Sequence, residues 1–150
     1  DGIDITPPNN PRSWDHCLLL IETGGLRILH WGDNRHNPPA RVWERLGRID
    51  ILLMPIDQSR HVMGYGMAEA AIDQLQPHVV IPHHYYIFDV IQRQSTLMSA
   101  HEWVIGRAHE CLTSAAKVYT RTQLVGLDRM VHYFGEHVAF DAKAWRDGDM

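Results

Sequence analysis

Three apolar runs of the sequence are each followed by histidine or aspartate side chains. The residues concerned are His30, Asp33 and His36 after the first run, Asp57 and His61 after the second, and His83 and His84 after the third. Imidazole nitrogen and carboxylate oxygen are both ligands of Zn²⁺ and related cations. These residue types therefore indicate a candidate metal site.

Each of these side chains also has an ordinary structural explanation. Asp33 could cap the following helix or close an Asx turn, and a histidine at a strand end is often half-buried and bonded to a backbone carbonyl. The loop with His61 would be solvated by default, although this region could instead orient a ligand or transfer a proton. His16, at the start of the first strand, could be a ligand or part of a polar face.

The apolar runs themselves predict strands of one sheet. "HCLLLIETGGLRILHWGD" predicts a β-hairpin, with strands at about 16–22 and 26–31 around Gly24 and Gly25. "IDILLMPI" and "HVVIPHHYY" predict buried strands, and "MAEAAIDQLQP" between them predicts a helix. Because a strand–helix–strand unit makes its strands parallel, the polar clusters are expected to open at one edge of the sheet.

The remaining pattern completes a single α/β domain over residues 1–150. Pro38 and Pro39 suit the first turn of a short helix that Gly47 ends. A long apolar stripe predicts a helix from Ser95 or Thr96 to Leu112. Weaker patterns in "KVYTRT" and "HVAFD" suggest further strands.

Composition excludes several classes of function. The 150 residues carry a net charge of -4 and no Lys/Arg run, which argues against nucleic acid as a partner. No apolar stretch reaches the roughly 20 residues that span a bilayer, and no signal peptide is recognisable, so we expect a cytoplasmic protein with no membrane partner. Cys17 and Cys111 lie in apolar runs and are expected to be buried thiols. Neither a nucleophile elbow nor a phosphate loop is present.

The order of these features resembles the C-terminal half of metallo-β-lactamase-fold hydrolases. The resemblance covers about residues 16–86 and rests on "LLLIETGGLRILHWGD", a short helix, "GRIDILLMPI" and "MAEAAIDQLQPHVVIPHHY". It is closest to the branch that includes ascorbate-6-phosphate lactonase and many uncharacterised metal-dependent hydrolases. It implies an α/β fold in which this chain is half of an αββα sandwich, a mixed sheet with flanking helices.

The resemblance also implies roles for individual residues. The aspartate of the family's Gly-Asp motif bridges the metals and matches Asp33 after Gly32. The histidine two residues after the proline binds one metal and matches His84 after Pro82, and His83 stands where the family often has methionine. The implied activity is hydrolysis of a small-molecule lactone, ester or phosphodiester by hydroxide bound to a dinuclear Zn²⁺ or Mn²⁺ centre.

Part of the family's site has no match in this chain. The motif His-x-His-x-Asp-His, from the N-terminal half of the fold, is absent. Another family ligand precedes the first strand, where only His16 is available, so the remaining ligand is expected to be His16 or a residue before Asp1. His61 is the candidate catalytic residue that would steer a leaving group.

We therefore expect a fragment, a processed chain or half of a split protein, which pairs with a complementary polypeptide or with itself. The alternative is a non-catalytic α/β module that pairs with a partner chain, in which the histidines are structural.

Overall fold

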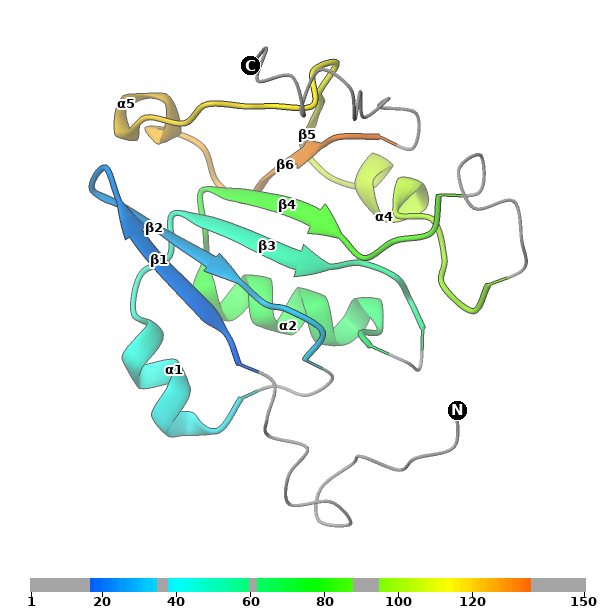
Figure 1. Ribbon diagram of the computed structural model, residues 1–150, viewed down its shortest axis with the longest axis horizontal. Helices are drawn as coiled ribbons and strands as arrows, with labels where there is room; N and C mark the ends of the chain where they lie inside the picture. Colours follow the sequence, from blue (N-terminus) through cyan, green and yellow to red (C-terminus); the bar gives the residue numbers. More distant parts are fainter. Residues whose placement is uncertain (1–16, 35–37, 60–61, 88–94, 136–150) are drawn as a thin grey trace, which may run out of the picture.

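A mixed six-stranded sheet organises the chain in the computed structural model, which describes residues 17–34, 38–59, 62–87 and 95–135 (Figure 1). Its strands lie in the order β1-β2-β3-β4-β6-β5. They are β1 (Leu19–Thr23), β2 (Leu26–His30), β3 (Ile51–Pro55), β4 (Val79–His83), β5 (His109–Cys111) and β6 (Met130–Tyr133). The helices are α1 (Ala40–Leu46), α2 (Tyr65–Leu75), α4 (His101–Ile105) and α5 (Arg121–Leu124).

The predicted hairpin is confirmed as β1 and β2, which pair antiparallel with Leu20 opposite Leu29. Gly24 and Gly25 form the turn with φ of +56° and +73°. Glycine adopts this left-handed region without the steric cost that a Cβ atom brings, so the two-residue turn needs both.

The predicted strand–helix–strand unit is also confirmed. β3 and β4 pair parallel, with Leu52 beside Val80, and α2 connects them. β2 pairs parallel with β3 through α1, and β4 pairs parallel with β6. Because β2, β3 and β4 run in the same direction, their C-terminal ends meet at one edge of the sheet, where the three arrowheads lie in Figure 1.

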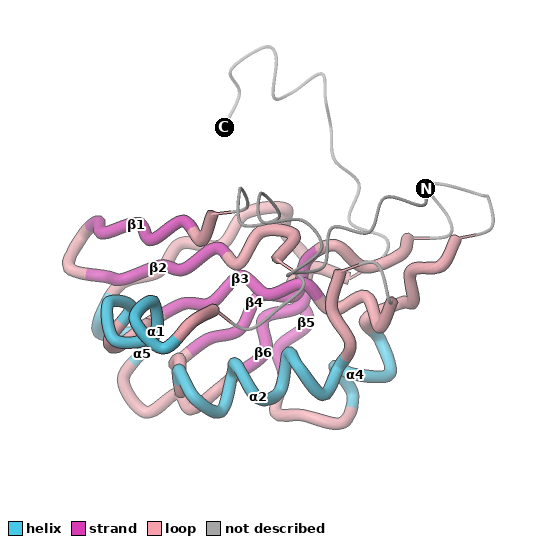
Figure 2. The backbone as a smooth tube through the Cα atoms, turned by 90° about the horizontal axis from the view of Figure 1, so that it is seen from below, coloured by secondary structure: helices cyan, strands magenta, loops and turns pink. Residues whose placement is uncertain are grey.

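The main core lies between the sheet and helices α1, α2 and α4, which Figure 2 shows on one side of the strands. Ala68 and Ala71 are fully buried and allow α2 to lie close to β3. Leu29, Leu52 and Met54 are fully buried beneath the helices. Burying a side chain of this size contributes roughly 1.5–3 kcal/mol, so this layer is the main support of the strand ends.

The opposite face of the sheet has a smaller apolar cluster. Leu124 of α5 packs there with Leu26, Ile51 and Val79. Towards β1 the same face is open, since Leu19 and Ile21 are 53% and 48% exposed. We call Leu19, Ile21, Ile28, Leu53 and Ile81 the open apolar face.

The C-terminal third differs from the sequence prediction. The long helix predicted up to Leu112 is wrong, because α4 ends at Ile105 and Gly106 follows as its C-cap. His109–Cys111 instead forms β5, whose backbone pairs with β6. Ala100, Trp103 and Val104 are buried in the core, whereas His109–Cys111 is exposed. Parallel pairing with β6 replaces the helical hydrogen bonds beyond Gly106.

Two further predicted strands and the predicted burial of the cysteines have different outcomes. "KVYTRT" is not a strand, since α5 begins at Arg121, and β6 was not predicted. "HVAFD" lies outside the described residues. The two cysteines are free thiols as expected, but both are exposed rather than buried. Cys111 ends the outer strand β5, and Cys17 precedes the outer strand β1.

Candidate metal centre

The C-terminal edge of the sheet brings together side chains that are far apart in the sequence. Asp33 follows β2, Asp57 follows β3, and His84 follows β4. His84 lies between the two carboxylates, with Nδ1 3.2 Å from Asp57 Oδ2 and Nε2 3.8 Å from Asp33 Oδ1. The parallel strands thus deliver the predicted pair Asp33 and His84 to the same place.

Asp33 does not have the capping role that was its structural alternative. The N-cap of α1 is Pro39, and no side chain caps that helix. The Asp33 side chain is 54% exposed, and Gly32 before it has a φ of +65°. A turn that only glycine adopts easily therefore directs Asp33 away from the strand and towards His84.

Asp57 is fully buried, contrary to the solvated loop expected for this segment. Its Oδ1 accepts hydrogen bonds from the backbone N–H groups of Ser59 and Met63, at 3.3 and 3.2 Å. Its Oδ2 accepts from Ser59 Oγ at 2.8 Å and faces His84 Nδ1. A buried carboxylate is stable only when its oxygens are bonded in this way.

His83 has a different environment from its neighbour His84. Its ring packs against His30, with the ring centroids 4.7 Å apart, on the open face of the sheet. Burial, with smaller contributions from His30 and His84, lowers the pKa of His83 to about 4, so this imidazole is neutral near pH 7. Its Nε2 atom is buried without a hydrogen-bond partner in the described part of the chain. His30 Nδ1 accepts the Gly32 N–H at 2.9 Å and so supports the turn before Asp33.

The other predicted site residues cannot be placed. His16, His36 and His61 lie outside the described residues. Among the residues that are described, no group of three or more histidine, cysteine or acidic side chains could hold a metal ion. Asp33 and His84 are two candidate ligands, fewer than a metal site needs.

The geometry of this pair fits a shared cation better than a direct bond. The 3.8 Å between His84 Nε2 and Asp33 Oδ1 is too long for a hydrogen bond. Two ligand atoms that bind one Zn²⁺ tetrahedrally at about 2.1 Å are about 3.4 Å apart. A small movement of the half-exposed Asp33 side chain would bring both atoms to that separation.

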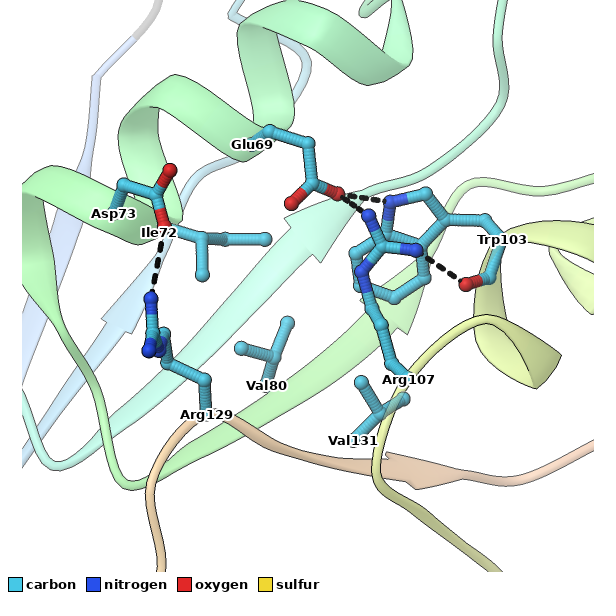
Figure 3. A pocket seen from close by; sticks show the side chains of 8 residues that line it. All are labelled: Glu69, Ile72, Asp73, Val80, Trp103, Arg107, Arg129 and Val131. Carbon is cyan, nitrogen blue, oxygen red and sulfur yellow. Dashed lines mark hydrogen bonds and ion pairs between the residues drawn. The ribbon is translucent and has the colours of Figure 1, made fainter.

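A cavity of about 150 Å³ lies elsewhere, between α2, α4 and the start of β6 (Figure 3). Four charged side chains line it, and they pair across it as Arg107 with Glu69 and Arg129 with Asp73. Its floor is apolar, with Val80 and Val131. Both arginines are already paired with carboxylates across the cavity. These ion pairs connect α2 with the segments after α4 and before β6, and they leave neither arginine free to bind an anionic substrate.

No helix in the described part of the chain is long and apolar enough to cross a membrane.

Comparison with known proteins shows to which proteins this chain is similar. Residues 3–84 match the model of the beta-lactamase superfamily domain. A UPF0173 metal-dependent hydrolase of Methanosarcina mazei is 35% identical over 75 residues, which are 50% of this chain and 32% of that protein. Another, from Symbiobacterium thermophilum, is 29% identical over 114 residues, 73% of this chain and 50% of that protein.

A solved structure has the same fold. It is a Thermotoga maritima protein assigned as a Zn-dependent hydrolase of the metallo-beta-lactamase superfamily, with a TM-score of 0.56 and 24% identity. The match covers 76% of this chain and 56% of that protein. The chain thus spans between a third and about half of the length of these curated relatives.

Proposed function

Because the chain belongs to the beta-lactamase superfamily, we propose that it provides Asp33 and His84 to the metal centre of a hydrolase. The observation that carries this proposal is the approach of these two side chains, from different strands, to 3.8 Å at the C-terminal edge of the sheet. The names of the relatives, as metal-dependent hydrolases, support the same reaction type.

The residues of this chain would hold and orient the metal. His84 would bind through Nε2, since Nδ1 faces Asp57, and Asp33 would bind through its exposed carboxylate. The metal, proposed to be Zn²⁺ or Mn²⁺ in a dinuclear site, would polarise a carbonyl or phosphoryl oxygen and lower the pKa of water at the site. The proposed substrates are lactones, esters or phosphodiesters, and the proposed location is the cytoplasm.

A metal would need further ligands besides Asp33 and His84. Within this chain, His16 remains the proposed additional ligand. We propose that a segment with the motif His-x-His-x-Asp-His completes the site. The open apolar face beside His30 and His83 supports this, because apolar side chains in such a row are usually covered by a partner surface. His61 remains the residue that we propose to steer the leaving group.

The experiment is metal analysis of the purified chain and of two variants. Two ligands leave most tetrahedral positions open, so we expect well below two equivalents of transition metal in the chain alone. With the complementary segment present, Asp33→Asn and His84→Ala should each weaken Zn²⁺ binding and hydrolysis about a hundredfold, the effect of losing a ligand or its close support.

The matched control is Asp73→Asn, an exposed carboxylate on α2 that pairs with Arg129 away from the edge. It should leave metal affinity unchanged. Two tightly held equivalents in this chain alone, or unchanged affinity in both ligand variants, would contradict the proposal.

A further inference from the structure

We infer that Asp57 is a positioning residue, which fixes the ring orientation and the tautomer of His84 so that Nε2 is presented to a metal. This inference rests on the proposed function, because it takes His84 as a ligand. It adds a residue from the third strand end to a site otherwise formed by the ends of β2 and β4.

The Asp57 carboxylate is itself held in place. Its four contacts come from two backbone N–H groups, the Ser59 hydroxyl and His84 Nδ1. Ser59 Oγ also accepts the Val62 N–H at 3.2 Å, which closes the loop around the carboxylate. With no exposed surface, Asp57 cannot turn towards solvent, so its Oδ2 is a fixed acceptor for His84.

The backbone holds the two residues opposite each other. The Ile56 N–H donates to the His83 carbonyl at 3.0 Å, which extends the pairing of β3 and β4 up to the site. The Met98 N–H donates to the Asp57 carbonyl at 2.7 Å. His84 has a φ of +56°, a conformation that costs a residue with a Cβ atom of the order of 1 kcal/mol.

That backbone conformation turns the His84 ring across the strand end towards Asp57. His83 and His84 therefore do not simply alternate as in a regular strand.

The contact with Asp57 determines which nitrogen of His84 can bind a metal. A carboxylate only accepts hydrogen bonds, so His84 Nδ1 must carry the proton. In the neutral ring Nε2 then has the free lone pair, and this is the atom that faces Asp33. Carboxylates that bond a metal-binding imidazole in this way also increase its basicity, and their loss typically costs 10- to 100-fold in metal affinity.

Asp57→Asn tests this directly, because the amide has one acceptor and one donor end. The Ser59 and Met63 N–H groups require the acceptor, so the amide NH₂ would face His84 Nδ1. His84 would then have to accept at Nδ1 and carry its proton on Nε2, the wrong tautomer for a metal. We expect Zn²⁺ affinity to fall 10- to 100-fold.

The matched control is Ser59→Ala, which removes two hydrogen bonds of the same loop but keeps the carboxylate. It should lower thermal stability and change Zn²⁺ affinity less than threefold. An equal loss of affinity in both variants would show that Asp57 acts only through the loop structure and would overturn the inference.

The tautomer is measured without any metal, by nitrogen-15 NMR of histidine-labelled protein. The His84 signal is identified by its absence in His84→Gln. We expect the Nδ1–H form in the natural protein and the Nε2–H form in Asp57→Asn. Finding Nε2–H in the natural protein would overturn the inference even if Asp57→Asn does not fold.

Different experimental results would contradict the proposed function and this inference. Unchanged Zn²⁺ affinity in His84→Ala would remove the metal role of His84 while leaving the tautomer result intact. A tautomer that does not respond to Asp57→Asn would remove Asp57 as the positioning residue while leaving His84 as a ligand.

Discussion

His83 and His84 are adjacent, yet only one of them faces Asp33. The His83 ring packs on His30 within the sheet face, while the left-handed backbone at His84 turns its ring to the strand end. The sequence predicts that neighbouring side chains of a strand diverge. Which of the two rings faces Asp33 depends on the backbone turn at His84, which the strand pattern does not predict. The choice of His84 as the expected ligand comes from the resemblance to the family.

We predict that His83→Met weakens Zn²⁺ binding less than tenfold, in contrast to His84→Ala. Methionine has no unpartnered ring nitrogen. The Leu53 carbonyl, which also bonds the His83 ring, keeps the backbone N–H of Trp31 as its donor. Removing a buried unsatisfied nitrogen should raise the free energy of unfolding by about 1 kcal/mol. Isothermal titration with Zn²⁺ and urea unfolding measure the two effects.

The reverse result, with binding lost in His83→Met and kept in His84→Ala, would show that the ligand has been assigned to the wrong histidine.

The sequence predicts the position of Asp57 but not its burial. Its position directly after a buried strand marks it as a candidate at the site edge. Its burial does not follow from the pattern, because "DQSRHVMG" reads as a polar loop. The burial results from the turn at Gln58, with a φ of +51°, and from the N–H groups of Ser59 and Met63 that close over the carboxylate.

At the scale of elements, α2 and α4 are joined by a polar contact at the edge of the core. Glu69 Oε1 accepts a hydrogen bond from Trp103 Nε1 at 2.5 Å and also pairs with Arg107 (Figure 3). The Arg107 guanidinium lies over the Trp103 ring, 4.0 Å from its centroid. Since Trp103 is only 3% exposed, its N–H depends on Glu69.

We therefore predict that Glu69→Ala lowers the free energy of unfolding by about 2 kcal/mol, because a buried indole N–H loses its acceptor. Asp73→Ala, one turn further along α2, is the matched control. Its exposed pair with Arg129 is screened by solvent, so its loss should lower the free energy of unfolding much less. Urea unfolding monitored by tryptophan fluorescence compares them, and equal losses would contradict the role assigned to Glu69.

Strands β5 and β6 meet at a buried histidine that makes stability depend on pH. His132 Nδ1 lies 2.8 Å from the Tyr119 hydroxyl, and Nε2 lies 3.4 Å from Glu110 Oε2. Burial lowers the pKa of His132; Glu110 opposes this shift and Lys117 adds to it. Burial and Glu110 raise the pKa of Tyr119 to about 12, so Tyr119 stays a neutral hydroxyl.

The sign of the effect follows from the lowered pKa. Below the unfolded pKa of about 6.5, the unfolded chain takes up a proton at His132 before the folded protein does. We predict that the stability contributed by the buried, neutral His132 is complete above pH 6.5. It is lost as the pH falls towards the pKa of His132 in the folded protein. Unfolding at pH 7.5 and 5.5 should show a smaller loss in His132→Gln than in His109→Gln, which changes an exposed residue of β5. The same loss of stability in both variants would contradict the role assigned to His132.

The elements that the sequence predicts well are those fixed by short-range patterns. The hairpin follows from its two glycines, and β3, α2 and β4 follow from continuous apolar runs and a helical stripe. The region after Ser95 is predicted wrongly because apolar residues at helical spacing do not show where a helix stops, and of residues 95–112 only Ala100, Trp103 and Val104 are buried in the core. β6 is missed because its pairing with β4 and β5 joins segments distant in sequence.

At the scale of the whole molecule, the two faces of the sheet are unlike. One is covered by α1, α2 and α4, while Leu19 and Ile21 on the other remain about half exposed. A row of exposed apolar side chains beside a candidate site is a typical surface for association.

We predict that Leu19→Lys and Ile21→Lys each reduce association of the chain, either with a complementary segment or with itself. A lysine on this face would lose its hydration when the face is covered. Ile105→Lys is the matched control, since Ile105 is 57% exposed and lies on α4, which covers the other face of the sheet. Light scattering compares the variants. A natural chain that stays a monomer of 17.3 kDa with and without candidate partners would contradict the prediction.

The separation of Asp33 and His84 along the chain has a consequence for chain entropy. Two helices and two strands, α1, β3, α2 and β4, lie between them. In the folded protein the two side chains already lie close together, whereas the unfolded chain would have to close this long loop, at a cost in entropy, before both could bind one cation. Ligation would therefore also stabilise the fold, by about 2.7 kcal/mol at a metal concentration a hundredfold above the dissociation constant.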